Sequence, residues 1–244
     1  MTETETLKRF AVTQELDLTK QILDEGLNSL DRINFGKDHY YVVFLLIANG
    51  LERLLKITII LGLFEKLGHF PTEAECNWRK KGARGHNLET LVDQVTETCY
   101  SPKWKANKRG KTDFDYLIGN KLFRKVLKVV SDFGVGLRYA NLNIILGKES
   151  VRGPEQVWQK MELDLFMIFD PDMVTLSRPE PEKSRDIYSK VIQLLSDSLR
   201  HGIGSIARLY TMGELSPLAR QASPLLSGYY QFIKDSVLSE DRSS

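Results

Sequence analysis

Apolar residues recur at three- and four-residue steps along most of this chain, the spacing typical of helices that bury one face. The pattern predicts helices over residues 12–33, 38–68, 87–99, 113–134, 155–169, 182–210 and 224–238. Strict alternation of apolar and polar positions, which indicates half-buried strands, is nearly absent. We therefore expect an all-α protein, an up-and-down helical bundle with a long central helix and additional C-terminal helices.

The predicted central helix, residues 38–68, is the most apolar part of the chain. Its stretch 42–51 is largely apolar, but Glu52, Arg53 and Lys56 interrupt the pattern. A membrane span needs about 20 apolar residues without such charges. We interpret the segment as a buried helix roughly 40 Å long that ends at Gly68, and we expect no membrane association.

Capping and proline signals suggest how the remaining helices begin. Asp113 is a good N-cap for the helix that ends at Gly134, and Pro154 and Pro181 stand where a first helical residue tolerates proline. The proline-rich stretch 170–183 is the best candidate for an internal linker. We predict one helical domain over residues 1–244, with basic loop excursions at 68–86 and 101–112.

Composition narrows the class of protein without naming a function. The chain has 244 residues, 42% apolar and 27% charged, with a net charge of +2. Cys76 and Cys99 are the only cysteines, too few for a disulfide framework and without metal-ligand spacing. We predict a cytoplasmic protein with no metal and no cofactor, and the acidic N-terminus does not suggest a secretory signal.

Two motifs lie on the central helix and at the start of the next one. The first is Gly-x-Glu-x-x-x-Lys at residues 50–56, and the second is Gly-His-Asn-Leu-x-x-Leu at residues 85–91. Their order, with a loop between them, resembles the HEPN superfamily of helical-bundle domains over about residues 38–146. The resemblance implies a metal-independent ribonuclease or a partner of a nucleotidyltransferase, in a defence or toxin–antitoxin system.

The nuclease members of that superfamily carry an arginine with a histidine a few positions further on. Here the resemblance implies catalytic roles for Arg79 and His86, whereas Arg200 and His201 are adjacent and cannot take both roles. Metal-free RNA cleavage needs a general base for the 2′-hydroxyl and a cation for the phosphorane, which suit these residue types. Alternatively, His86 caps its helix or bonds a backbone carbonyl, and the loop arginines are simply solvated.

A basic segment surrounds the helix predicted at 87–99. Residues 78–111 contain nine cations against three carboxylates, a local charge of +6 in a chain of +2. Aromatic residues lie between these cations, a composition that suits phosphate neutralisation with base stacking. The alternative is a pair of soluble loops whose tryptophans pack back onto the bundle. The candidate nucleic-acid contacts are Lys80, Lys81, Arg84, Lys103, Trp104, Lys105, Lys108, Arg109 and Lys111.

Charged and amide residues suggest a polar pocket. Glu52 and Lys56 lie one helical turn apart. They form an ordinary intrahelical pair, anchor a network to His86 or Arg138, or mark a self-association face. Arg138, Tyr139 and Asn141 follow the Gly134 break and can line the same pocket. The alternative for this last group is a glycine corner between helices with local amide hydrogen bonds.

Two functional hypotheses remain open. The first is a HEPN-like protein associated with RNA or a nucleotide, with uncertain ribonuclease activity and a possible nucleotidyltransferase or antitoxin partner. The second is a noncatalytic interaction or scaffold protein that forms a homodimer through an apolar helical face. Salt-sensitive RNA binding that depends on the basic segment would favour the first hypothesis.

Overall fold

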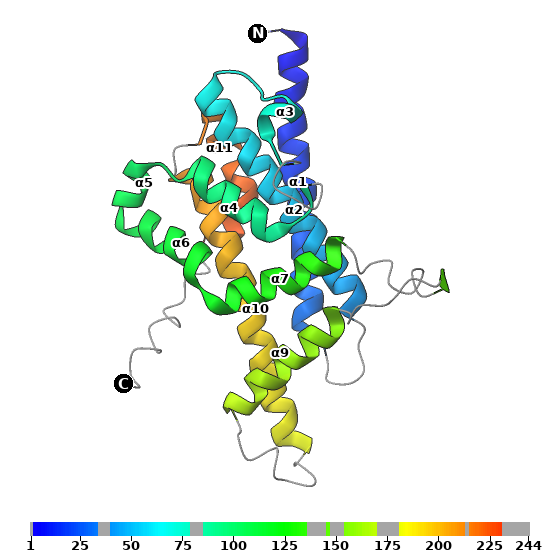
Figure 1. Cartoon of the computed structure of the whole chain (residues 1–244). Helices are drawn as coiled ribbons and strands as arrows, with labels where there is room; N and C mark the ends of the chain where they lie inside the picture. The colour runs from blue at the N-terminus through cyan, green and yellow to red at the C-terminus, as the bar shows by residue number, and fades with distance from the viewer. Residues whose placement is uncertain are drawn as a thin grey trace.

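The computed structural model describes residues 2–33, 40–78, 85–135, 145–146, 154–169, 181–212 and 215–230. Of these residues 88% are helical and none is in a strand, so the predicted all-α fold is confirmed. The longer helices are α1 (Glu3–Asp31), α2 (Tyr40–Leu67), α4 (Leu88–Cys99), α6 (Lys108–Gly119), α7 (Lys121–Val135), α9 (Pro154–Phe169) and α10 (Pro181–Thr211) (Figure 1). The shorter ones are α3 (Glu73–Cys76), α5 (Pro102–Ala106), α11 (Pro217–Ala222) and the 3₁₀ helix η4 (Ser223–Tyr229).

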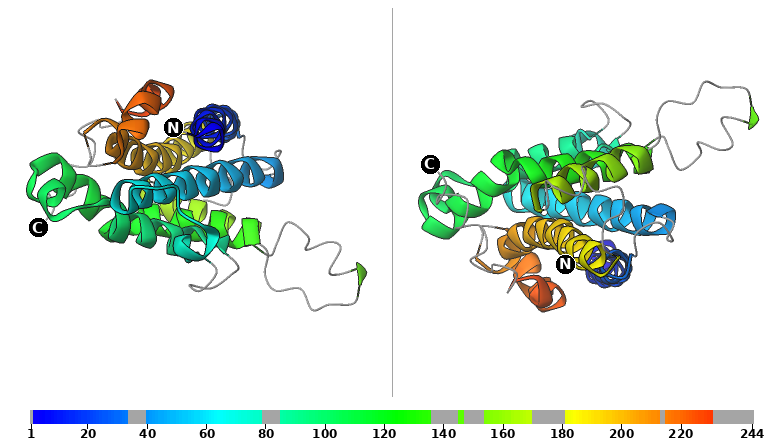
Figure 2. Two further views of the ribbon diagram at one scale, coloured as in Figure 1. Left: turned by 90° about the horizontal axis from the view of Figure 1, so that it is seen from above. Right: turned by 90° about the horizontal axis from the view of Figure 1, so that it is seen from below.

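Helix α2 lies in the middle of the molecule. One layer contains α1 and α10, and the opposite layer contains α4, α6, α7 and α9 (Figure 2). Because α2 has neighbours on both sides, it is apolar around most of its circumference, and buried side chains occur along its whole length. The buried apolar residues form one continuous core that joins both layers.

Two glycines let α1 and α2 approach closely. A Cβ atom at Gly26 of α1 would lie 2.9 Å from Cγ1 of Ile47, and one at Gly50 of α2 would lie 2.7 Å from Cδ2 of Leu23. Both distances are too short for a real carbon contact. The glycine of the Gly-x-Glu-x-x-x-Lys motif therefore has a packing reason that is independent of any family.

Several helix boundaries match the sequence pattern closely. Helix α4 begins after Asn87, whose side chain accepts a hydrogen bond from the backbone N–H of Thr90, and α2 ends before Gly68, which has φ +74°. Helices α9 and α10 begin at Pro154 and Pro181, as predicted. Helix α1 begins nine residues earlier than predicted, at Glu3 rather than Val12, because Thr2 caps it.

The predicted helix over 113–134 is wrong in its boundaries. The structure has two helices there, because Asn120 adopts an extended conformation and its side chain caps α7 by accepting from the N–H of Phe123. Asp113, predicted as an N-cap, lies in the interior of α6 and is fully buried. The apolar pattern continues across Asn120, so periodicity alone does not show where α6 ends and α7 begins.

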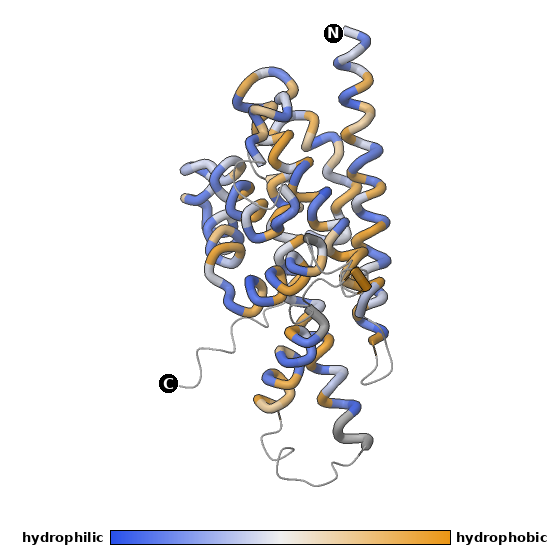
Figure 3. Tube along the Cα trace, turned by 45° about the vertical axis from the view of Figure 1, so that its right-hand side comes forward, coloured by the Kyte–Doolittle hydropathy of each residue, from blue (hydrophilic) through white to orange (hydrophobic). Residues whose placement is uncertain are grey.

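Residues 101–112 were predicted as a loop, but most of them are helical. Ser101 caps α5 by accepting from the N–H of Trp104, and Asn107 caps α6 by accepting from the N–H groups of Arg109 and Gly110. Gly110 is needed here, because a Cβ atom would lie 2.7 Å from Cδ2 of the Trp104 ring. This segment is largely hydrophilic in comparison with α2 (Figure 3).

The C-terminal region also differs from the prediction. In place of a helix over 224–238, α11 and η4 cover residues 217–229, and residues 231–244 lie outside the described part. Ser216 caps α11, and Pro217 and Pro224 occupy first-turn positions. The proposed linker at 170–183 lies outside the described residues as far as 180, and α10 occupies its last three positions.

Candidate functional site

The Glu52 cluster joins α2 to the residue before α4. Lys56 Nζ donates to Glu52 Oε1 at 2.7 Å, and His86 Nδ1 lies 2.9 Å from the same oxygen. The three side chains are between about one quarter and one half exposed. Glu52 therefore forms the intrahelical pair with Lys56 and also the contact with His86, which are two of the alternatives considered for it.

Local backbone geometry places His86 beside α2. Gly85 has φ +80°, a conformation that side-chain-bearing residues rarely adopt, and a Cβ atom there would lie 3.1 Å from the Trp78 ring. The Nζ atom of Lys56 lies 5.4 Å from the centre of that ring. Trp78 thus packs against both the glycine turn and the lysine, and its ring closes one side of the cluster.

Electrostatics keeps Glu52 ionised. Burial alone would raise the pKa of Glu52, but hydrogen bonds from Lys56 and His86 outweigh it, and the pKa lies below its usual value. An ionised carboxylate only accepts hydrogen bonds, so the proton of the His86–Glu52 contact resides on Nδ1. The other ring nitrogen, Nε2, makes no hydrogen bond to the described residues.

A histidine whose Nδ1 is held by a carboxylate is the arrangement that a general base requires, and His86 has it. A carboxylate that holds Nδ1–H fixes the ring orientation, and in the neutral imidazole of this tautomer the lone pair is on Nε2. His86 is not the N-cap of α4, since Asn87 takes that role. Arg79, the other predicted catalytic residue, lies outside the described residues, as do Arg138, Tyr139 and Asn141 of the predicted polar pocket.

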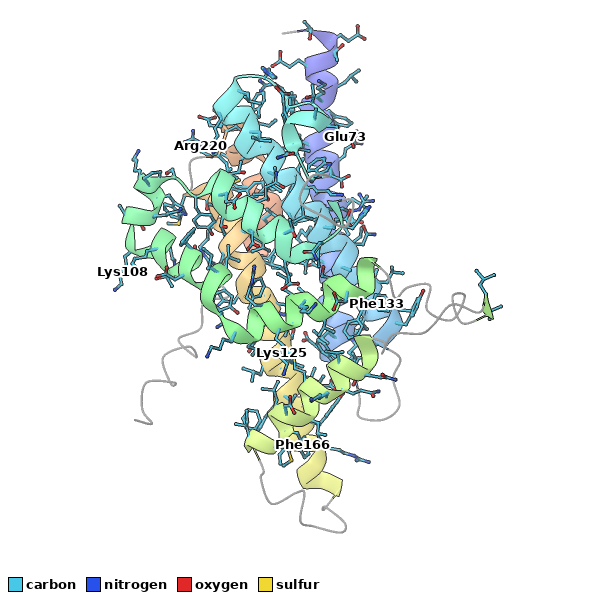
Figure 4. The ribbon with its side chains drawn as sticks, in the orientation of Figure 1. Glu73, Lys108, Lys125, Phe133, Phe166 and Arg220 are labelled. Carbon is cyan, nitrogen blue, oxygen red and sulfur yellow. The ribbon has the colours of Figure 1, made fainter. Side chains whose placement is uncertain are left out.

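The second candidate region is the basic hairpin, which we define as the five cations of α5 and the first turn of α6. Residues 101–112 contain no carboxylate. Lys108 lies at the outer edge of the molecule (Figure 4). Lys105 lies 4.1 Å from the Phe114 ring centre, and Lys111 pairs with Asp115 at 2.8 Å. The five cations are Lys103, Lys105, Lys108, Arg109 and Lys111.

The aromatic residues of this segment do not form a stacking surface. Trp104 is 7% exposed and Tyr100 is 3% exposed, and the Tyr100 hydroxyl donates to the carbonyl of Ser205. The prediction that Trp104 contacts nucleic acid is therefore wrong, because its ring packs into the core against Gly110. The alternative, in which the tryptophan packs back onto the bundle, describes Trp104 correctly.

The two candidate regions lie at opposite ends of one helix. His86 precedes α4 and Ser101 follows it, so the 12-residue helix separates them by about 18 Å. His86 and the basic hairpin therefore do not meet. Three of the predicted nucleic-acid contacts, Lys80, Lys81 and Arg84, lie outside the described residues.

The adjacent pair Arg200 and His201 has a structural role. Arg200 bonds Asp31 of α1 at 2.7 Å, and His201 is 8% exposed with its ring stacked on Tyr116 at 3.8 Å. Burial, followed by the nearby charges of Arg208 and Arg109, lowers the pKa of His201 to about 4. The imidazole is therefore neutral near pH 7 and contributes to the α6–α10 interface.

A buried ion pair also anchors α6, and with it the basic hairpin, to α10, and no local sequence pattern indicates this pair. Arg208 donates to both oxygens of Asp113 at 2.6 and 2.8 Å, and both side chains are almost completely buried. Ser205 adds a hydrogen bond to the same carboxylate. The only related feature of the sequence is the position of Asp113 inside an apolar stripe, and that position predicts an N-cap instead.

No family model, curated protein or solved structure matches this chain. Within the described ranges, no group of three or more histidine, cysteine or acidic side chains could hold a metal ion. Among the helices described, none is both long and apolar enough to cross a membrane.

Proposed function

We propose that this protein binds single-stranded RNA through the phosphate backbone, with the basic hairpin as its contact surface. The observation that carries the proposal is the placement of five cations within nine residues of two consecutive capped helices, in a segment without a carboxylate. Clustered lysine and arginine side chains bind polyanions by releasing condensed counterions. The resemblance to the HEPN superfamily favours RNA over other polyanions.

Other exposed lysines are a useful contrast. Lys125 pairs with Asp164, Lys128 with Asp132, and Lys190 with Asp186, so these positions carry their own carboxylates. Lys111 of the basic hairpin also pairs with a carboxylate, Asp115, and the hairpin differs from these positions in having five cations and no carboxylate within residues 101–112. Since Trp104 and Tyr100 are buried, contacts are expected with phosphates rather than with bases, and sequence preference should be small.

The experiment measures fluorescence anisotropy of a labelled RNA oligonucleotide with a variant in which all five hairpin cations are glutamine. A control variant carries glutamine at Lys8, Lys20, Lys125, Lys128 and Lys190, which changes the net charge equally. We expect the hairpin variant to lose at least tenfold in affinity and the control to change less than threefold. Equal losses in both variants would contradict the assignment to the hairpin.

Ribonuclease activity is a second candidate function, favoured by the Glu52–His86 contact. His86 Nε2 would take the proton of a 2′-hydroxyl, whose oxygen attacks the adjacent phosphorus. The bond from phosphorus to the 5′-oxygen breaks, a 2′,3′-cyclic phosphate forms, and the leaving oxygen takes a proton from water.

This candidate is tested by metal-free incubation with labelled RNA. The wild type is compared with His86→Ala, Glu52→Gln and Arg79→Ala, and with His69→Ala as a control histidine that lies outside the cluster. Cleavage that is lost in His86→Ala and retained in His69→Ala would support the role of His86. Binding without cleavage by the wild type would leave the RNA-binding proposal intact and remove the catalytic one.

A further inference from the structure

A second glutamate, Glu162, is enclosed where α2, α9 and α10 meet. It is 5% exposed and lies among the side chains of Tyr40, Trp158 and Tyr188. Tyr40 also stacks on Phe44, and Trp158 contacts both rings, so the site is walled by aromatic groups. Water has little access to this carboxyl group.

Three polar contacts reach the carboxyl group, and a fourth joins two of its partners. Trp158 Nε1 donates to Oε1 at 2.6 Å, and the Tyr188 hydroxyl lies 3.2 Å from the same oxygen. The Tyr40 hydroxyl lies 2.7 Å from Oε2, and the two tyrosine hydroxyls lie 2.9 Å apart. Three oxygen-to-oxygen contacts therefore form a closed ring through Glu162, Tyr40 and Tyr188.

Counting protons distinguishes the two charge states. Each tyrosine hydroxyl supplies one proton, so an ionised Glu162 leaves one of the three contacts with two lone pairs and no proton. A neutral Glu162 supplies the missing proton. Oε2–H then donates to Tyr40, Tyr40 donates to Tyr188, and Tyr188 donates to Oε1.

Among the described residues, no cation bonds Glu162. The described groups that contact its carboxyl are Tyr40 from α2, Tyr188 from α10 and Trp158 from its own helix. Lys125 of α7 pairs with another carboxylate of α9, Asp164. Burial raises the pKa of Glu162 above its usual value, although hydrogen bonds from Tyr40, Trp158 and Tyr188 act in the opposite direction.

We propose that Glu162 is a protonation switch, whose neutral acid closes the ring that fastens α9 to α2 and α10, and whose ionisation opens it. The carboxyl proton is the only one that leaves or returns. When it leaves, the Glu162 charge stays buried and one ring contact becomes repulsive, which favours separation of α9 from its neighbours. The device is independent of RNA binding at the basic hairpin.

The first test follows the infrared spectrum of the intact protein as the pH is raised from below 4.5, the usual glutamate pKa. At the acidic end, a carbonyl stretch of a buried protonated carboxyl group is expected in the wild type and in Asp164→Asn, which removes an exposed carboxylate from the same helix. The band should be missing in Glu162→Gln. In the wild type it should disappear with a midpoint above 4.5, and a midpoint at or below 4.5 would overturn the proposal, whatever the variants do.

The second test follows amide hydrogen exchange of α9 as a function of pH, corrected for the intrinsic exchange rate. Above the pKa of Glu162 in the folded protein, local opening of wild-type α9 should increase up to tenfold per pH unit. Glu162→Gln mimics the neutral acid and should show a flat profile with protection at least equal to the wild type. A flat wild-type profile, or weaker protection in Glu162→Gln at neutral pH, would contradict the switch.

Discussion

Glu52 lies on α2 and Glu162 contacts Tyr40 of α2, yet the surroundings of the two glutamates shift their pKa values in opposite directions. Glu52 is about one quarter exposed and receives hydrogen bonds from Lys56 and His86. Glu162 is almost completely buried and meets only neutral donors. The pKa of Glu52 is consequently lowered and the pKa of Glu162 is raised.

The difference shows that the number of hydrogen bonds does not decide the charge of a carboxyl group. Glu162 has more hydrogen-bonding partners than Glu52, but burial is the larger effect on its pKa. Glu52 combines one cation, Lys56, with a hydrogen bond from His86 and partial solvent access, so it stays charged and can orient the His86 ring. A third carboxylate, Asp113, combines complete burial with a cation, Arg208, and completes the comparison.

The largest effect is expected for Asp113→Ala, which leaves the Arg208 guanidinium buried without its carboxylate. Removing one partner of a buried ion pair costs about 3–5 kcal/mol. Denaturant unfolding should show this loss, together with weaker attachment of α6 to α10. Asp115→Ala, at an exposed position on the same helix, should change the unfolding free energy by less than about 1 kcal/mol.

Glu162→Ala should be the next most destabilising change, by about 3 kcal/mol, because it leaves a cavity and takes the acceptor from Trp158 and Tyr188. Glu162→Gln should cost far less, since the amide can donate to Tyr40 and accept from Trp158. The same unfolding measurement compares the two variants. An equally large loss in Glu162→Gln would contradict the ring of hydrogen bonds proposed for the neutral acid.

The pH dependence of unfolding should separate the two glutamates by sign. Glu162 has a raised pKa, so its stabilising contribution is complete below the usual glutamate value of 4.5 and is lost as the pH rises through its folded-state pKa. Glu52 has a lowered pKa, so its contribution is present above 4.5 and is lost as the pH falls.

Unfolding curves of the wild type, Glu52→Gln and Glu162→Gln over a range of pH test this contrast. Each curve can differ from the wild type by up to about 1.4 kcal/mol per pH unit in its own window. We expect the two variants to diverge from the wild type at opposite ends of the range. Divergence of both at the acidic end would contradict the raised pKa of Glu162.

The smallest effect on stability is expected for Glu52→Gln at neutral pH, at most about 1 kcal/mol, because solvent screens the partly exposed pair. Its effect on the chemistry of His86 should be larger, since the carboxylate that fixes the ring is gone. In nuclear magnetic resonance spectra, the His86 Nδ1 proton should exchange with solvent faster in the variant than in the wild type, because its acceptor on Glu52 is gone. An unchanged exchange rate would separate His86 from Glu52 in function.

Helix content and most of the long helices could be predicted from periodicity, because α2, α4, α9 and α10 have apolar patterns with clear caps or prolines. The break at Asn120 could not, since the apolar stripe continues across it and only the extended backbone of Asn120 reveals the turn. The Glu52–Lys56 pair could be predicted because both residues lie on one helix, four positions apart. The contact with His86 was one of several alternatives, because no local pattern decides between them.

The remaining polar contacts depend on residues far apart in the sequence. Asp113 bonds Arg208 and Glu162 bonds Tyr40, and neither pair has a spacing that a local pattern can detect. Trp104 was misinterpreted for a related reason. A tryptophan among lysines has the composition of a binding surface, but Gly110 makes room for its ring in the core.

The most direct test of the RNA-binding proposal is the salt dependence of affinity for single-stranded RNA. If the five cations of the basic hairpin contact phosphates, the slope of log affinity against log salt concentration should be steeper in the wild type than in the hairpin variant by about 3.5. The control variant should keep the wild-type slope. Equal slopes in the wild type and the hairpin variant would contradict the proposal that this surface binds RNA.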